Sequence, residues 1–162
     1  TVVEVGWLLG IPILTGSIMR LPMGILTDKF GGKYVFSFLL LLCSIPLFLL
    51  PFADSFFMFA VLSFMFGMVG TSFAVGIGFT SVWYPKEWQG RALGIFGMGN
   101  AGAAITTFMA PSLLNEFSID DPQNGWKLLP VIYACGLIVI GVIFLIFTKN
   151  KKAIHIRVYE KV

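Results

Sequence analysis

Arg20 is a charged residue placed well inside a long apolar stretch of the sequence. It lies about 10 Å before the end of that stretch at Thr27, if the stretch is helical. Holding an arginine at the centre of a membrane helix costs about 2.5–3.5 kcal/mol. Its side chain therefore either extends back to the lipid headgroups or faces an internal cavity. Small and polar residues share its helical face and favour the cavity, namely Ile13, Gly16, Ser17, Gly24 and Thr27.

The long apolar stretches contain no aspartate or glutamate that could neutralise Arg20; Glu4 and Asp28 lie at the ends of the first one. A guanidinium without a buried carboxylate, in a region of low dielectric constant, is a candidate site for an anion. Its planar fork grips planar oxyanions through two parallel hydrogen bonds. The chemistry predicted at Arg20 is therefore anion binding.

Asn100 is an amide near the middle of another apolar stretch, so it needs hydrogen-bond partners in a neighbouring helix or in a bound polar solute. It follows Gly97 and Gly99 and precedes Gly102, which together match the G-x-G-x-x-G fingerprint of dinucleotide-binding proteins. That fingerprint has meaning only between a strand and a helix of a soluble βαβ unit. Here the glycines, like Gly16 and Gly24, predict close helix packing or a cavity wall.

Catalytic and metal-binding patterns are lacking. The single histidine, His155, lies in a basic tail, and Cys43 and Cys135 lie within apolar stretches, where we interpret them as small buried residues. The sequence has neither a paired buried carboxylate nor a Cys/His metal-ligand spacing. We expect no enzyme, no metal, no cofactor and no nucleic-acid partner.

The elements that position these residues are membrane helices. Apolar residues make up 57% of the 162 residues and charged residues only 12%, about half the usual share of a globular protein. We expect residues 1–148 to be transmembrane and to lie in a lipid bilayer, with 149–162 as a cytoplasmic basic linker. The expected spans, each near or above the roughly 20 residues that cross a bilayer, are 5–27, 34–53, 56–84, 91–114 and 126–148.

The loop charges predict the orientation of these spans. Basic residues outside the spans lie in the loops at 28–33 and 85–91 and in the tail, whereas the opposite loops contain acidic residues and only Lys127. Positively charged loops stay in the cytoplasm. The carboxyl terminus is therefore expected inside the cell and Thr1 outside, in the inner or plasma membrane. An outward amino terminus leads us to expect a further helix before Thr1.

The loop sequence Gly24-Ile-Leu-Thr-Asp28-Lys29-Phe-Gly31-Gly-Lys33 resembles the G-x-L-x-D-[RK]-x-G-x-[RK] motif of the major facilitator superfamily. Gly32 stands where a basic residue is common. The segment 70–111 is similar to the nitrate signature of the nitrate/nitrite porter family, through Gly-Thr-Ser-Phe73, Trp-Tyr-Pro85, Gln89-Gly90 and Gly97-Met-Gly99-Asn100-Ala-Gly102. An arginine at the position of Arg20 also fits that family.

The resemblance implies an all-α membrane protein whose five spans are helices two to six of a twelve-helix transporter, so that the first helix and the whole second half lie outside this chain. It implies that Arg20, Phe73 and Asn100 bind nitrate or nitrite, with Phe73 packed on the planar anion. Gly24, Asp28, Lys29, Gly31 and Lys33 would form a cytoplasmic gate motif. In such repeated folds Arg20 and Asn100 would face one central cavity.

Three functions remain as alternatives. The leading one is secondary active transport of nitrate, nitrite or both by alternating access. The second is a major facilitator carrier for another small, organic anion. The third is a membrane scaffold subunit that transports nothing, which leaves Arg20 without a purpose.

Overall fold

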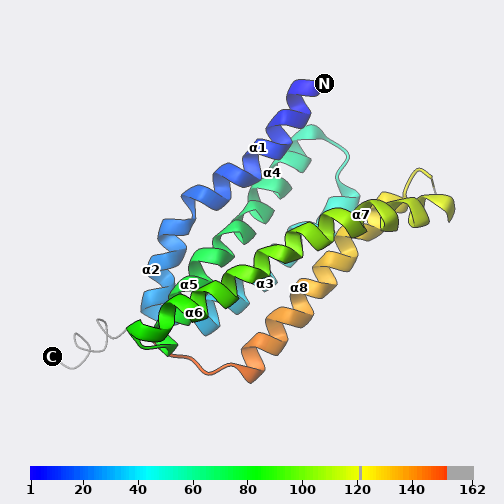
Figure 1. Cartoon of the computed structure of the whole chain (residues 1–162). Coiled ribbons are helices and arrows are strands. Elements are labelled where there is room, and N and C mark those ends of the chain that lie inside the picture. The colour runs from blue at the N-terminus through cyan, green and yellow to red at the C-terminus, as the bar shows by residue number, and fades with distance from the viewer. Residues whose placement is uncertain (121, 153–162) are drawn as a thin grey trace.

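The computed structural model describes residues 1–120 and 122–152. The end of the expected linker, 153–162 with His155, lies outside this range. Within the described residues every regular element is a helix, which confirms the predicted all-α fold (Figure 1). The α-helices are α1 (Val2–Ile18), α2 (Arg20–Phe30), α3 (Gly32–Leu49), α4 (Phe56–Gly67), α5 (Ser72–Trp83), α6 (Lys86–Gly97), α7 (Ala101–Asp120) and α8 (Leu128–Phe147). Four short 3-10 helices are η1 (Leu50–Phe52), η2 (Met68–Thr71), η3 (Met98–Asn100) and η4 (Gly125–Lys127).

Consecutive helices join into longer rods. Four rods are long and apolar enough to cross a membrane, and α1 and α2 form a fifth if their bend of 40° is counted within one span. The four are Gly32–Phe52, Phe56–Trp83, Lys86–Ile119 and Gly125–Phe147. The third extends beyond both ends of the apolar stretch 91–114, because the helix continues into polar residues that hydropathy assigns to loops.

The rods lie roughly alongside one another (Figure 1). Helix α3 lies at the centre, where it packs most extensively against α8 and also contacts α4 and α5, while α1 packs on α4 and α2 on α5. The buried core surrounds α3 and consists of Met23, Val35, Leu39, Cys43 and Val75. Helix α6 joins this bundle through α5, and α7 has its described contacts mainly near η3, η4 and α8.

Helices α1 and α4 approach each other so closely that their backbones touch. A Cβ carbon at Gly16 would lie 2.9 Å from the carbonyl oxygen of Gly67. One at Gly67 would lie 2.5 Å from the Cα atom of Pro12. These glycines permit the crossing because small residues bring helix backbones together in a membrane.

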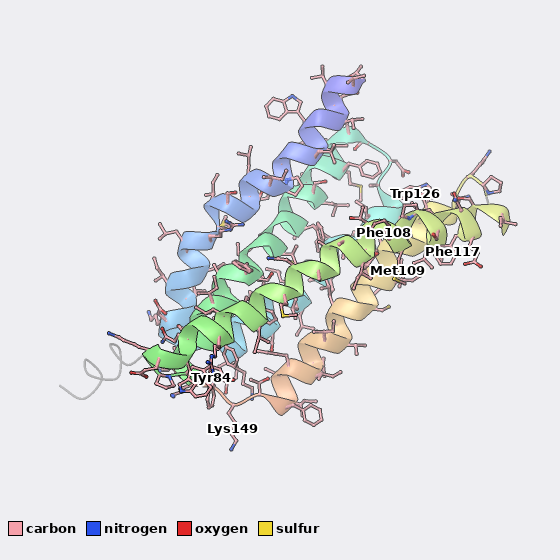
Figure 2. The ribbon with its side chains drawn as sticks, viewed as in Figure 1. Tyr84, Phe108, Met109, Phe117, Trp126 and Lys149 are labelled. Carbon is pink, nitrogen blue, oxygen red and sulfur yellow. The ribbon has the colours of Figure 1, made fainter. Side chains whose placement is uncertain are left out.

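The outer surfaces of the rods are apolar. Large side chains such as Ile13, Phe57, Phe108 and Phe147 are exposed, and side chains project outward along the whole bundle (Figure 2). Figure 2 also shows Tyr84 and Lys149 at one end of the bundle and Trp126 at the other. A bundle that is apolar outside is typical of a protein that spans the bilayer several times.

Candidate functional site

A cavity of about 600 Å³ lies among the rods, and residues from four of them line it. Arg20, Phe73 and Asn100, the three residues that sequence analysis assigned to anion binding, all contribute to its wall. The complete lining is Arg20, Phe36, Gly70, Ser72, Phe73, Phe96, Gly99 and Asn100. The fold therefore brings together one cation, one amide, one hydroxyl and three aromatic rings from distant parts of the chain.

Three rods break where they reach this cavity. Met19 interrupts the first rod, and Arg20 is the first residue after the break. The 3-10 helix η2 contains Gly70 and directly precedes Ser72 and Phe73. A short 3-10 stretch inside a helix often marks a functional hinge, and interrupted helices are where transporters hold their substrates.

The third break, η3, ends on Asn100. Pro22, in the first turn of α2, has no N–H to donate to the carbonyl oxygen of Ile18, and this accounts for the break at Met19. No proline lies in η2 or η3; these two breaks contain Gly70 and Gly99 instead, and glycine weakens a helix.

The guanidinium of Arg20 makes no hydrogen bond or ion pair with any described residue. Within residues 1–120 and 122–152 the one ion pair joins the amino terminus to Glu4, at the far end of α1. The hydroxyl groups near Arg20 are already used inside their own helix: Ser17 donates to the carbonyl oxygen of Ile13 at 2.8 Å. All the donors of Arg20 are thus available to a ligand in the cavity.

Asn100 likewise has no hydrogen-bond partner among the described residues. The Asn100 amide can donate and accept hydrogen bonds at the same time. Its partner can therefore be either an oxyanion or a polar group of a neighbouring helix. Phe73 is 39% exposed, and its ring lies 5.6 Å from the ring of Phe96, measured between centroids. The exposed part of Phe73 is available to a planar ligand.

The glycines that the sequence singled out fall into two groups. Gly16 lies at the α1–α4 crossing described above. Gly24, Gly97, Gly99 and Gly102 are different, because a Cβ carbon at any of them would meet no described atom within 4 Å. Of these four, Gly99 lines the cavity. The others pack against nothing in the described part of the chain.

The loop motif forms the tight connection between α2 and α3. Gly31 ends α2 with φ +91°, a backbone conformation that other residues rarely adopt, and its N–H donates to the carbonyl oxygen of Thr27 at 2.9 Å. The ammonium groups of Lys29 and Lys33 lie over the rings of Phe30 and Tyr34, at 5.6 and 5.7 Å. Asp28 makes no ion pair with a described residue.

Gly32 departs from the usual motif for a reason that the structure supplies. A Cβ carbon there would lie 2.5 Å from the Cβ carbon of Phe79 on α5. The ring of Phe79 packs in turn on Phe144 of α8, at 5.4 Å between centroids. A basic side chain at position 32 would displace this aromatic contact.

The sequence did not point to Ser72, Phe36 and Phe96 as cavity residues. Ser72 directly precedes Phe73 in the signature and could have been found there, whereas nothing in the sequence distinguishes Phe36 from other apolar helix residues. Gln89 belongs to the signature segment. Its side-chain amide donates to the carbonyl oxygens of Ser81, at 2.9 Å, and Tyr84, at 3.2 Å, so it fixes the turn from α5 into α6.

Apolar rods that break around a cavity with polar groups in its wall are typical of secondary transporters. Residues 1–161 match the family described as the Major Facilitator Superfamily. The chain belongs to the major facilitator superfamily, and it is a multi-pass membrane protein.

Its similar proteins include three transporters named for nitrate or nitrite. The chain is 38% identical to the probable nitrate/nitrite antiporter NarK1 of Thermus thermophilus, over 92% of this chain and 35% of that protein. It is 32% identical to the nitrite extrusion protein of Bacillus subtilis (98% and 39%) and 34% identical to the probable nitrate transporter NarT of Staphylococcus carnosus (85% and 36%). These relatives confirm the resemblance to nitrate/nitrite porters that the motifs predicted.

The chain spans between 35% and 39% of the length of these three relatives. No solved structure matches it significantly.

Proposed function

We propose that this chain supplies part of the first half of a secondary transporter for nitrate, nitrite or both. The observation that carries the proposal is the single cavity lined by Arg20, Phe73 and Asn100. In this view the guanidinium grips two anion oxygens, Phe73 lies on the anion's flat face, and Asn100 donates to the third oxygen of nitrate or shares one of the two oxygens of nitrite. The names of the relatives support nitrate and nitrite as the anions. The protein is a carrier and not an enzyme.

Transport proceeds by alternating access, in which two halves of the protein rock around the bound anion. The partners of this chain are accordingly the lipid bilayer, a preceding first helix and a second half of the same polypeptide. Arg20 lacks a partner among the described residues, so a bound anion relieves its unpaired charge.

The motif around Gly24, Asp28 and Gly31 acts as the cytoplasmic gate, and Lys29 and Lys33 hold that loop at the membrane surface.

The orientation follows from charge. Lys29, Lys33, Lys86 and Arg91 border the rod ends near Tyr84, as do Lys149 and Lys151 of the segment after α8. We assign this end to the cytoplasm because basic loops remain there, and Thr1 to the outside. The protein then resides in the inner or plasma membrane, and the segment from 149 onward starts a cytoplasmic linker.

A second candidate is a carrier for a small organic anion. The observation that favours it is again Arg20, because a guanidinium binds a carboxylate with the same two-bond geometry as nitrate. Uptake of labelled nitrate into proteoliposomes holding the full-length transporter separates the two. Excess nitrite should abolish the uptake, while formate and oxalate should leave it unchanged.

Competition by formate or oxalate that equals or exceeds competition by nitrite would favour the organic-anion carrier. The scaffold function would be favoured if the proteoliposomes take up none of the four anions, nitrate, nitrite, formate and oxalate, faster than protein-free liposomes do.

A further inference from the structure

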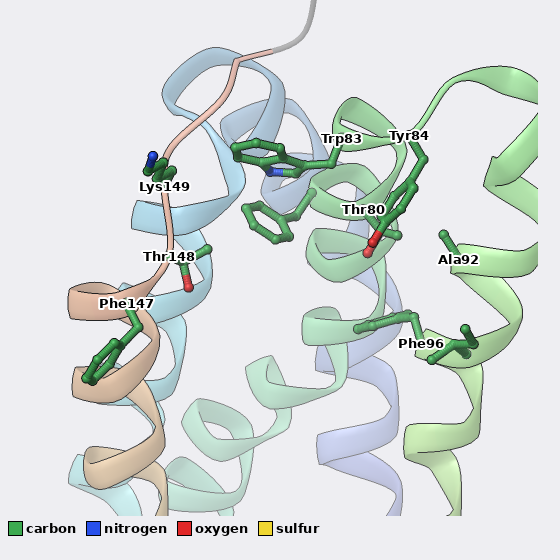
Figure 3. Close-up of a pocket in the computed structure, with 10 residues that line it drawn as sticks. Thr80, Trp83, Tyr84, Ala92, Phe96, Phe147, Thr148 and Lys149 are labelled. Atoms are coloured by element: carbon green, nitrogen blue, oxygen red, sulfur yellow. The ribbon is translucent and has the colours of Figure 1, made fainter.

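A second cavity adjoins the site at the end of the bundle near Tyr84. This cavity, called here the vestibule, has a volume of about 730 Å³, and Thr80, Trp83, Tyr84, Phe96, Phe147 and Lys149 are among its lining residues. Figure 3 shows Trp83, Tyr84 and Thr80 toward the end of the bundle and Phe96 deeper. The vestibule therefore lies between the anion site and the end of the bundle that we assign to the cytoplasm.

Phe96 is the residue common to the two cavities. Its ring lies 5.6 Å from that of Phe73, with a tilt of 34° between the planes. A second series of rings runs from Phe36 of the anion cavity through Phe144 to Phe79 of the vestibule, with centroids 4.9 and 5.4 Å apart. Two series of aromatic contacts thus connect the linings of the two cavities, one through Phe96 and one through Phe144.

The ring of Phe96 fits against α5 because position 76 is a glycine. A Cβ carbon at Gly76 would overlap the outer carbons of the Phe96 ring. Gly76 is itself buried. We call the space beside Gly76 that holds the ring the seat of Phe96. No residue larger than glycine fits at position 76 while the ring lies there, so the methyl group of an alanine would displace the ring.

Phe96 is also placed at a break. It is the second-last residue of α6, and η3 begins directly after that helix. At this junction the backbone N–H of Met98 is shared between the carbonyl oxygens of Gly94, Ile95 and Phe96. Shared hydrogen bonds and 3-10 geometry mark a backbone that changes shape at low cost. A change in η3 would move Phe96 and the anion-site residue Asn100 together.

We propose that Phe96 is the inner gate of the anion path, closed when its ring lies on Phe73 and Gly76 and open when the ring leaves that seat. The inference rests on the proposed function for the identity of the solute. It also assigns Gly76 a role, as the seat that the gate requires. Because Phe73 contacts both the gate and the anion cavity, a bound anion at Phe73 influences whether the gate closes.

The test measures access to the anion cavity and needs no transport. In the full-length transporter, Cys43 and Cys135 are replaced by alanine and Ser72→Cys provides a reporter thiol in the anion cavity. A second reporter, Thr80→Cys, lies in the vestibule. A membrane-impermeant thiol reagent is added on the side from which Thr80→Cys reacts, and the rate at Ser72→Cys is compared with and without Phe96→Ala.

We expect Phe96→Ala to speed modification of Ser72→Cys by about two- to tenfold, the shift that corresponds to losing one aromatic pair. Thr80→Cys should react at the same rate in both backgrounds. Gly76→Ala should also speed the reaction, whereas the matched Gly94→Ala, whose added carbon meets no described atom within 4 Å, should not. Combining Gly76→Ala with Phe96→Ala should add nothing, because the ring that the methyl displaces is gone.

Equal rates at Ser72→Cys with and without Phe96→Ala would overturn the gate. If Phe96→Ala does not yield folded protein by gel filtration, Gly76→Ala with its Gly94→Ala control decides the question alone. The readout is independent of substrate. A protein that fails to carry nitrate but shows the expected labelling pattern would keep the gate and lose the proposed function.

Discussion

Arg20, the first residue of α2, and Asn100, the last residue of η3, line one cavity although they come from opposite parts of the chain. Each follows or ends a break in its rod, and neither side chain is bonded to a described residue. An unpaired cation and an unpaired amide at one cavity can together bind an anion. The cation attracts the anion by its charge, and the amide orients it through a directional hydrogen bond. The first prediction concerns the amide.

Asn100→Ala should raise the KM for nitrate about tenfold or more, since a hydrogen bond to a charged group is worth roughly 1.5–3 kcal/mol. Asn100→Asp should impair transport further, because its carboxylate repels the anion and competes for Arg20. Initial uptake rates in proteoliposomes over a range of nitrate concentrations measure both.

Asn115 on α7 provides a matched control, because it does not line the cavity. Asn115→Asp should transport like the wild type. An Asn100→Asp variant with a wild-type KM would remove Asn100 from the anion site.

The α1–α4 crossing gives a prediction for stability. Gly16→Ala should destabilise the folded protein by about 1–3 kcal/mol, because the added methyl meets the backbone of Gly67 and the helices must separate. Thermal unfolding in detergent measures the change. Gly10→Ala, on the same helix and with no described atom within 4 Å of the new carbon, should unfold at the wild-type temperature or above it. The account of the crossing fails if the two variants unfold at the same temperature.

The turn at Gly31 predicts a stability loss of a different origin. Asn150, after α8, donates from its side chain to the carbonyl oxygen of Phe30 at 2.9 Å, and a Cβ carbon at Gly31 would overlap that side chain. Gly31→Ala should therefore combine the cost of a backbone conformation that only glycine adopts readily, about 1–3 kcal/mol, with loss of the Asn150 contact. Thermal unfolding again provides the measurement.

The double variant Gly31→Ala, Asn150→Ala separates these two costs. Removing Asn150 relieves the overlap but not the backbone strain, so the double variant should be less destabilised than the sum of the two single variants. If the losses in unfolding free energy of the two single variants add up to that of the double variant, the segment after α8 does not contact this turn. Gly136→Ala, in open space on α8, is the control.

Long apolar stretches made the all-helical membrane fold predictable, since hydropathy reports burial in lipid directly. The breaks at η2 and η3 were not predictable, because no proline marks them, whereas Pro22 in the sequence could have indicated the break at Met19. Arg20 and Asn100 could be found because polar groups are costly in a membrane helix. Phe96 could not, since seventeen phenylalanines occur in the chain and only its three-dimensional contacts distinguish it, with Gly76, with Phe73 and with both cavities.

Arg20→Lys tests the central claim most directly. Lysine keeps the positive charge but loses the planar fork that holds two oxygens of one anion. In proteoliposomes with the full-length transporter, initial nitrate uptake by Arg20→Lys should fall by about tenfold or more, as expected when paired, charge-assisted hydrogen bonds are lost. Uptake by Arg20→Lys at the wild-type rate would contradict the assignment of Arg20 as the residue that binds the anion.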